Sequence, residues 1–229
     1  MSEQGRIWPR AVLFDLDGTL IDSAPDIRAA VNELLATHGI APLSLDQVHS
    51  FIGNGMKKLV ERAFAATSGP LTPERLEREY ADMFTFYARH LTGLTTLLPG
   101  AREMLAELKA QGIGLGLVTN KPQRFIETIL DHFGLSQLFA IAVGGDAGVP
   151  VKPAPDMLLA AMKALGAAPH ATVMVGDSAS DVLSARNAGV TAVLLRGGYT
   201  TIPVEELGAD ALIERLADLP AMLPTLRRG

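Results

Sequence analysis

Short, continuous apolar runs alternate with segments of helical periodicity along the chain from Gly100 onward. A run that is apolar throughout predicts a strand buried on both faces, and helices between such strands predict that the strands pair in parallel. The predicted strands are Ala11–Phe14, Ile113–Thr119, Leu138–Val143, Thr172–Gly176 and Thr191–Leu195. The predicted helices, each followed by a glycine suited to a left-handed helix end, are Ala101–Gln111, Gln123–Phe133, Pro155–Leu165 and Ser180–Ala188. The pattern predicts an α/β protein with a Rossmann-like parallel-sheet core.

Residues 23–95 follow a different pattern, because helical periodicity continues there with no strand between the helices. Ser23 is placed to cap the first helix, with Asp26 three residues later as in a capping box. We expect residues 23–95 to form a helical cap domain, inserted in an α/β core made of residues 1–22 and 96–229. Such an insertion lies over the carboxyl end of the sheet and can act as a lid.

Composition narrows the class of protein. The chain has 229 residues, a net charge of −5 and no cysteine, which excludes disulfides, thiolate catalysis and cysteine-ligated zinc. The sequence has no block of basic residues of the kind that binds nucleic acid. It also has no uncharged apolar run that approaches the ~20 residues needed to span a bilayer. Because no secretory signal is visible, we expect a soluble cytoplasmic protein, monomeric or homodimeric, with no nucleic-acid or membrane partner.

The segment Asp15–Ser23 carries the strongest functional signal. Asp15 and Asp17 stand where the first predicted strand ends, and ligands bind at that end of open α/β sheets. Two carboxylates this close are unfavourable unless a cation joins them, so the pair predicts a metal ion and phosphate chemistry. An EF-hand loop is excluded because Gly18 follows Asp17 directly. A hairpin turn would explain Asp17–Gly18 and leave Asp15 unexplained.

Later segments place polar residues at further strand ends and helix starts. Thr119 and Asn120 follow a predicted strand, where they would hold a phosphate oxygen or simply cap the next helix. Lys152 precedes a helix start, where a cation opposes the helix dipole unless an anion lies nearby. Asp177 and Asp181 follow another strand and again indicate a cation. Each of these motifs alone is a weak indication of function, but their order along the chain is specific.

In that order, the motifs Asp-x-Asp-Gly-Thr, Thr-Asn, Lys-Pro and Gly-Asp-Ser-x-x-Asp resemble those of the haloacid dehalogenase-like hydrolase superfamily. The resemblance runs from about Ala11 to about Tyr199 and implies an enzyme that hydrolyses phosphoric monoesters through an aspartyl-phosphate. An acid at position 17 favours phosphate esters, because the dehalogenases and phosphonate-cleaving members lack it.

The resemblance also implies a role for each motif residue. Asp15 would be the nucleophile and Asp17 the general acid and base, while Thr119 and Lys152 would hold the transferring phosphoryl oxygens. The implied cofactor is Mg²⁺. Its implied ligands are Asp15, the backbone carbonyl of Asp17, and Asp177, with Asp181 orienting Lys152 or a metal-bound water.

The predicted cap would set the substrate. Phe51–Ala63 resembles the cap segment of superfamily members that act on 2-phosphoglycolate, so we expect a small phosphorylated metabolite, first of all 2-phosphoglycolate, cleaved to glycolate and phosphate. The turn of Gly53, Asn54 and Gly55 would offer backbone N–H groups to the substrate, or only start a helix. The basic residues that follow, Lys57, Lys58 and Arg62, would meet the glycolate carboxylate, or only form a solvated helix face.

Other functions remain open at this stage. A sugar phosphate or pyrophosphate would suit the same core motifs, and a phosphomutase would use the same aspartyl-phosphate. A phospho-accepting receiver module also uses an aspartate, a threonine and a lysine on a parallel sheet, but it is about half as long and orders them differently.

Overall fold

Residues 8–226 are described by the computed structural model of the chain, so the outer ends of the predicted core, 1–7 and 227–229, lie outside the described residues. The strands are β1 (Ala11–Phe14), β2 (Ile21–Asp22), β3 (Thr96–Leu97), β4 (Gly114–Val118), β5 (Ile141–Val143), β6 (Thr172–Gly176), β7 (Thr191–Leu195) and β8 (Ala211–Ile213). The α-helices are α1 (Ala24–Ala36), α2 (Leu45–His49), α3 (Met56–Thr67), α4 (Pro73–Tyr87), α5 (Ala101–Ala110), α6 (Gln123–His132), α7 (Asp156–Leu165), α8 (Ala179–Ala188) and α9 (Leu219–Met222). Short 3-10 helices are Pro169–Ala171, Val204–Leu207, Leu216–Asp218 and Leu223–Leu226.

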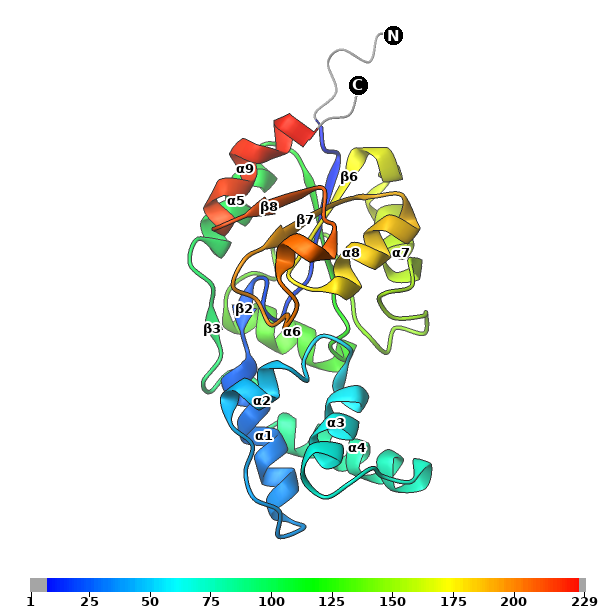
Figure 1. The fold of residues 1–229 in the computed structure, drawn as a ribbon. Helices are drawn as coiled ribbons and strands as arrows, with labels where there is room; N and C mark the ends of the chain where they lie inside the picture. Colours follow the sequence, from blue (N-terminus) through cyan, green and yellow to red (C-terminus); the bar gives the residue numbers. More distant parts are fainter. Residues whose placement is uncertain (1–7, 227–229) are drawn as a thin grey trace, which may run out of the picture.

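A six-stranded sheet of parallel strands forms the core, in the order β5-β4-β1-β6-β7-β8 (Figure 1). Phe14 of β1 lies between Leu117 of β4 and Val175 of β6. All the predicted strands enter this sheet, so the prediction of an α/β fold with a parallel core is confirmed. The sequence pattern does not predict β8, because its three residues give too short an apolar run.

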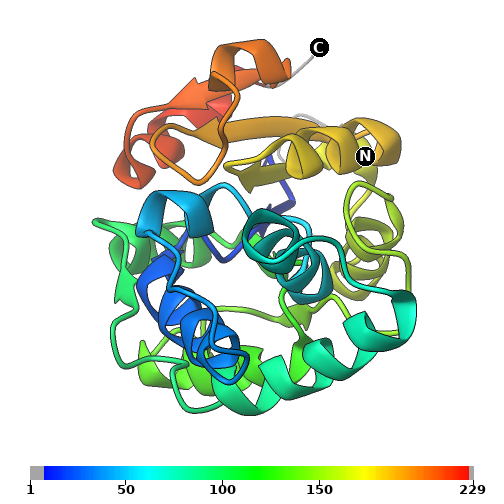
Figure 2. The same cartoon turned by 60° about the horizontal axis from the view of Figure 1, so that its bottom comes forward.

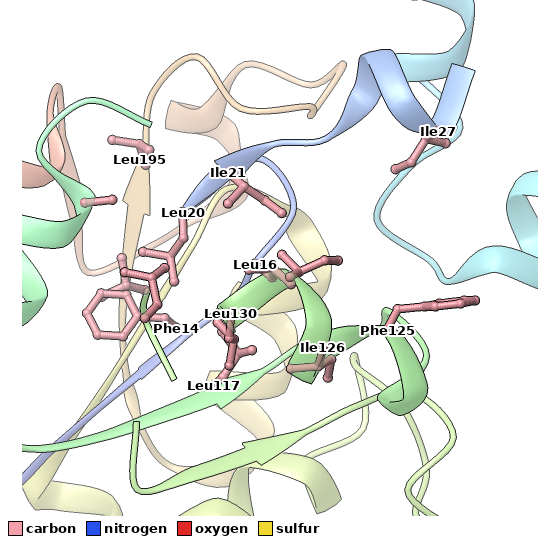
Figure 3. Packing of buried hydrophobic residues seen from close by; sticks show 14 of the residues in the cluster. Phe14, Leu16, Leu20, Ile21, Ile27, Leu117, Phe125, Ile126, Leu130 and Leu195 are labelled. Atoms are coloured by element: carbon pink, nitrogen blue, oxygen red, sulfur yellow. The ribbon is translucent and has the colours of Figure 1, made fainter. Parts of the chain in front are cut away.

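Helices cover both faces of the sheet. Because successive side chains of a strand point to opposite faces, Phe14 enters one apolar cluster and Leu13 the other. The first cluster includes residues of α5, α6 and α9, and Figure 3 shows Phe14, Leu117 and Ile126 within it. The second cluster includes residues of α7 and α8, such as Met157. This double cover explains why the strands are apolar throughout.

Helices α1, α2, α3 and α4 form a helical insertion between β2 and β3, as the sequence predicts. Helix α4 packs against both α1 and α3. The two chain connections pair as an antiparallel ribbon in which Ile21 lies opposite Leu97. The insertion lies at the end of the molecule opposite α9 (Figure 1), and Figure 2 brings it forward. The core and its helical insertion are therefore arranged as a sheet and a cap.

The first cap helix begins at the predicted position, but the predicted capping box is wrong. Ser23 occupies the N-cap position of α1 but makes no side-chain cap hydrogen bond. Its Oγ donates instead to Oδ1 of Asp17, at 2.5 Å. The carboxylate of Asp26 accepts hydrogen bonds from the backbone N–H groups of Leu94 and Thr95. Tertiary partners thus replace the local capping box.

No helix among residues 8–226 is both long and apolar enough to cross a membrane.

Candidate active site

Three of the candidate site residues predicted from the sequence lie where neighbouring parallel strands end. Asp15 directly follows β1, Thr119 follows β4 and Asp177 follows β6. Since β4, β1 and β6 are adjacent and parallel, their carboxyl ends meet at one edge of the sheet. The topology therefore brings together residues that are far apart along the chain.

Three buried carboxylates cluster at this edge: those of Asp15, Asp177 and Asp181. One carboxylate oxygen from each lies within 4.8 Å of the others. Burial raises the pKa of Asp15 to about 6; Lys152 opposes this rise, and the charges of Asp181 and Asp17 reinforce it. Burial likewise raises the pKa of Asp177 well above its usual value, reinforced by Asp181 and Asp15. The cluster therefore holds more negative charge than its surroundings neutralise.

Lys152 is fully enclosed between these carboxylates. Its Nζ lies 2.6 Å from Oδ1 of Asp181 and 3.0 Å from Oδ1 of Asp15, and it donates to the carbonyl of Val118. Burial acts to lower the pKa of this ammonium group, but the two carboxylates outweigh it and raise that pKa. Lys152 thus remains a cation beside Asp15.

Both carboxylate oxygens of Asp181 accept hydrogen bonds from neighbouring residues. Its Oδ1 accepts the bond from Lys152, and its Oδ2 accepts hydrogen bonds from the backbone N–H and Oγ of Ser178 and from the backbone N–H of Asp177. Asp15 differs, because no described donor meets its Oδ1 with hydrogen-bond geometry, although that atom is buried. Of the two, Asp181 is placed to orient its neighbours and Asp15 to meet a ligand.

Glycines make the space for this cluster. A Cβ on Gly198 would lie 2.3 Å from Oδ2 of Asp177, and one on Gly18 would lie 2.5 Å from the same atom. Gly18 also has a φ of +83°, a conformation that favours glycine. The chain therefore wraps closely around Asp177. Buried, hard oxygen ligands in this arrangement suit a divalent cation.

Asp17 has a buried lysine as its partner. Nζ of Lys121 lies 2.8 Å from Oδ1 and 3.1 Å from Oδ2 of Asp17. The same Nζ lies 4.7 Å from the ring centroid of Tyr87, on cap helix α4. Burial acts to lower the pKa of Lys121, but Asp17 outweighs it and, with Tyr87, raises that pKa. Lys121 is therefore a second buried cation of the site.

Lys121 is not among the site residues predicted from the sequence. It directly follows Thr119 and Asn120 and directly precedes Pro122, at a helix start. This is the same context that singles out Lys152, so the signal that could have found it is present in the sequence. With both lysines counted, four carboxylates at positions 15, 17, 177 and 181 face two ammonium groups. One divalent cation would balance the difference.

Asn120 connects the core with the cap. Its Nδ2 donates to the backbone carbonyls of Lys152 and Gly53, and its Oδ1 accepts from the backbone N–H of Lys152. Oγ1 of Thr119 accepts only the backbone N–H of Lys121, at 3.3 Å. The Thr119 hydroxyl proton thus has no described protein acceptor, whereas Asn120 is held on three sides.

A cavity of about 50 Å³ lies between the sheet edge and the cap. Asp15, Asp17, Thr119, Asn120, Lys121 and Pro122 line it from the core. Ile27, Ile52, Gly53, Gly55, Met56, Leu59, Met83 and Tyr87 line it from the cap and the residues beside it. The structure thus brings the sequence-predicted residues Gly53 and Gly55 to the same cavity as Asp15.

The other polar cap residues predicted at the substrate have other partners. The exposed Asn54 accepts a hydrogen bond from Arg62 through its Oδ1, and Arg62 also donates to the carbonyl of Phe51. Lys57 pairs with Glu77, and Lys58 pairs with Glu61. None of these side chains lines the described cavity.

Comparison with known proteins shows the family of this chain. The profile of the haloacid dehalogenase-like hydrolases matches residues 12–195. A phosphoglycolate phosphatase of Caulobacter vibrioides is 40% identical over 94% of this chain and 91% of its own length. Phosphoglycolate phosphatase 1 of Pseudomonas aeruginosa is 41% identical over 92% of this chain and 78% of its own. The chain therefore belongs to the haloacid dehalogenase-like hydrolase family.

Solved structures give the same result for the fold. The crystal structure of a predicted phosphoglycolate phosphatase from Haemophilus somnus superposes with a TM-score of 0.88 and 32% identity, covering 93% of this chain and 97% of that one. The sequence-based predictions of the family and of a phosphatase are thus confirmed.

Proposed function

We propose that this enzyme is a Mg²⁺-dependent phosphatase that hydrolyses 2-phosphoglycolate to glycolate and phosphate. The observation that carries the proposal is the buried Oδ1 of Asp15, which lies 3.0 Å from Nζ of Lys152 and accepts no hydrogen bond of good geometry. A carboxylate oxygen beside a fixed cation is suited to attack an electrophilic phosphorus whose oxygens that cation holds.

Asp15 is the nucleophile in this proposal. Its carboxylate attacks phosphorus and forms an aspartyl-phosphate, which water then hydrolyses, so that one difficult displacement becomes two easier ones. Lys152 and the hydroxyl of Thr119 hold the equatorial oxygens of the transferring group. Asp181 keeps the Lys152 ammonium in place through their 2.6 Å contact.

Asp17 is the general acid and base. It lines the cavity next to Asp15, where a leaving alkoxide would form, and its carboxylate is held by Ser23 and Lys121. It would give a proton to the alkoxide in the first step and take one from water in the second.

A bound Mg²⁺ would neutralise charge on the transferring group. We propose that Asp15, the backbone carbonyl of Asp17 and Asp177 hold it, with Asp181 acting from behind. Two observations support this assignment. The buried carboxylates lie within 4.8 Å of one another, and Gly18 and Gly198 approach Asp177 so closely that a Cβ on either would clash with its carboxylate.

The relatives and the cavity together support the substrate. Proteins about 40% identical over nearly the whole chain carry the name phosphoglycolate phosphatase. The cavity is small, at about 50 Å³. A small ester fits such a space better than a nucleotide or a long sugar phosphate. Gly53 and Gly55 are proposed to contact it, and Asn120 to hold the loops around it.

The test is phosphate release from a panel of esters with Mg²⁺: 2-phosphoglycolate, sugar phosphates, nucleotides and pyrophosphate. We expect kcat/KM for 2-phosphoglycolate to exceed the others by at least about 100-fold, a difference of about 2.7 kcal/mol in transition-state binding. A flat profile, or a peak at another ester, would contradict the substrate and leave the phosphatase chemistry. Phosphate release that needs a bisphosphate activator would favour a phosphomutase.

The sequence-based expectations of location, assembly and domain division remain part of the proposal. We propose a cytoplasmic enzyme, monomeric or homodimeric, with the cap at residues 23–95.

A further inference from the structure

The cavity between core and cap has one strongly polar corner. Its cap wall is made of Ile52, Met56, Leu59 and Met83 together with the ring of Tyr87. Among the described residues that line the cavity, Lys121 carries the one cationic side chain. A ligand with an anionic group beyond its phosphoryl group would therefore find a single cation within the cavity.

Lys121 is held in place without using all its hydrogen-bonding capacity. Its side chain is 3% exposed, and Asp17 and the face of the Tyr87 ring lie against the ammonium group. An ammonium group has three N–H donors, and the hydrogen bonds of Lys121 to Asp17 run to the two oxygens of that carboxylate. Donor capacity therefore remains for a ligand in the cavity that Lys121 lines.

The basic residues of the cap do not supply an alternative. Lys57 and Lys58 pair with glutamates on exposed helix surfaces, and Arg62 fastens the loop before α3. Each of these side chains is engaged with another part of the cap. An anionic group in the cavity is consequently left with Lys121.

We propose that Lys121 recognises a carboxylate carried by the leaving group of the substrate and so sets specificity for esters of 2-hydroxy carboxylates. The inference rests on the proposed function, because it takes Asp17 as the acid that meets the ester oxygen. In such an ester the carboxylate carbon is separated from the ester oxygen by a single carbon atom. A cation 2.8 Å from the Asp17 carboxylate is placed where that carboxylate arrives.

This role differs from positioning Asp17 alone. A lysine that only held Asp17 would affect every phosphate ester in the same proportion, and mainly through kcat. A lysine that also binds the substrate carboxylate affects esters that carry a carboxylate far more than esters that lack one, and mainly through KM. The ratio of the two effects separates the roles.

The experiment compares 2-phosphoglycolate with 2-hydroxyethyl phosphate, an ester of the same chain length whose leaving group is uncharged, in the wild type and in Lys121→Met. Methionine keeps the length of the side chain and removes its charge. We expect kcat/KM for 2-phosphoglycolate to fall by about 100-fold more than that for 2-hydroxyethyl phosphate, as for truncation of one partner in a buried charge pair. Lys57→Met, which removes an exposed lysine of the cap, is the matched control and should change neither value.

A parallel loss with both esters would overturn the proposal. A measurement on the wild type keeps the test independent of how the variant folds: glycolate should inhibit at least about tenfold more strongly than glycolamide, its neutral counterpart. Equal inhibition would also overturn it. A third ester, 2-phospholactate, separates this inference from the proposed function. If the wild type prefers 2-phospholactate and Lys121→Met abolishes that preference, the inference stands and 2-phosphoglycolate as the substrate fails.

Discussion

The backbone N–H of Tyr199 donates a 2.7 Å hydrogen bond to Oδ2 of Asp177. The phenol of the same residue donates to Oδ1 of Asp22 and accepts the backbone N–H groups of Ser23 and Ala24. One residue thus joins a carboxylate of the acidic cluster to the connection that leads into the cap. The position of the cap and the shape of the cluster are fixed through shared contacts.

Tyr199→Phe should destabilise the protein. The backbone groups of Ser23 and Ala24 are buried, and without the phenol oxygen their N–H donors lose an acceptor. The expected loss is about 1–3 kcal/mol in the free energy of unfolding, measured by urea denaturation. Tyr80→Phe is the control, since Tyr80 is half-buried and its hydroxyl has no described hydrogen bond; it should change stability by less than about 0.5 kcal/mol. Equal effects would show that the phenol contacts are unimportant.

Asp15→Asn should abolish turnover and preserve the fold. The amide is nearly isosteric with the carboxylate but is a poor nucleophile, so kcat should fall by at least about 1000-fold. Loss of the charge also relieves repulsion with Asp181 and Asp17, so circular dichroism and melting should report a folded protein. Asp46→Asn, at an exposed position on α2, should keep wild-type activity. Phosphate release by Asp15→Asn at the wild-type rate would refute the covalent mechanism.

Lys152→Met should cost stability as well as activity. The substitution leaves the fully buried carboxylate of Asp181 without its cation, which typically costs about 3–5 kcal/mol. Adding Asp181→Asn removes the unpaired charge, so the double variant should recover part of that stability and remain inactive. Urea denaturation of both variants tests this. A single variant as stable as the wild type would show that Asp181 does not depend on Lys152.

Local patterns in the sequence are enough to place the core of the site. Asp15, Thr119 and Asp177 each end an apolar run, and parallel pairing of those runs brings the three residues to one edge. The hydrogen-bond and ion-pair partners of side chains could not be predicted in this way, because they depend on residues distant along the chain. Ser23 turns to Asp17 instead of its own helix, and Lys57 pairs with Glu77 from another helix.

Lys121 illustrates the same limit within the site. The pattern Thr-Asn-Lys-Pro at a helix start marks Lys121 as a candidate in the same way as Lys152, but it gives no indication that the lysine is buried against Asp17 and Tyr87. Its burial follows from two contacts that only the fold creates, with Asp17 from the first strand end and with Tyr87 from the cap. The same holds for Asn120, whose amide holds the backbones of Lys152 and Gly53.

Metal-free protein should become less stable as the pH rises from about 4 to about 6. Burial raises the pKa of Asp15 from 3.8 to about 6 and moves that of Asp177 in the same direction. The folded state therefore binds protons more tightly than the unfolded state in this range, and stability is lost as those protons leave. Urea denaturation in EDTA at a series of pH values measures the slope.

Mg²⁺ should reverse that loss. At a hundredfold excess over its dissociation constant, a ligand that binds only the folded state adds about 2.7 kcal/mol of stability. The gain should be greater at pH 7 than at pH 4, because protonated carboxylates are poor ligands. Stability that is the same in Mg²⁺ and EDTA at pH 7 would argue against a metal at Asp15 and Asp177.

Gly198→Ala should weaken Mg²⁺ binding without replacing any of the proposed ligands. The added Cβ would lie 2.3 Å from both Cβ and Oδ2 of Asp177, so the carboxylate must move away from the position it shares with Asp15. Displacing a ligand through its surroundings typically lowers metal affinity by about 10–100-fold, and the Mg²⁺ concentration at half-maximal activity should rise accordingly. Gly93→Ala is the matched control, because its Cβ would come no closer than 3.5 Å to Oδ1 of Asp26. If both variants keep the wild-type Mg²⁺ dependence, Asp177 is not held by the contact with Gly198, and its proposed role as a ligand loses that support.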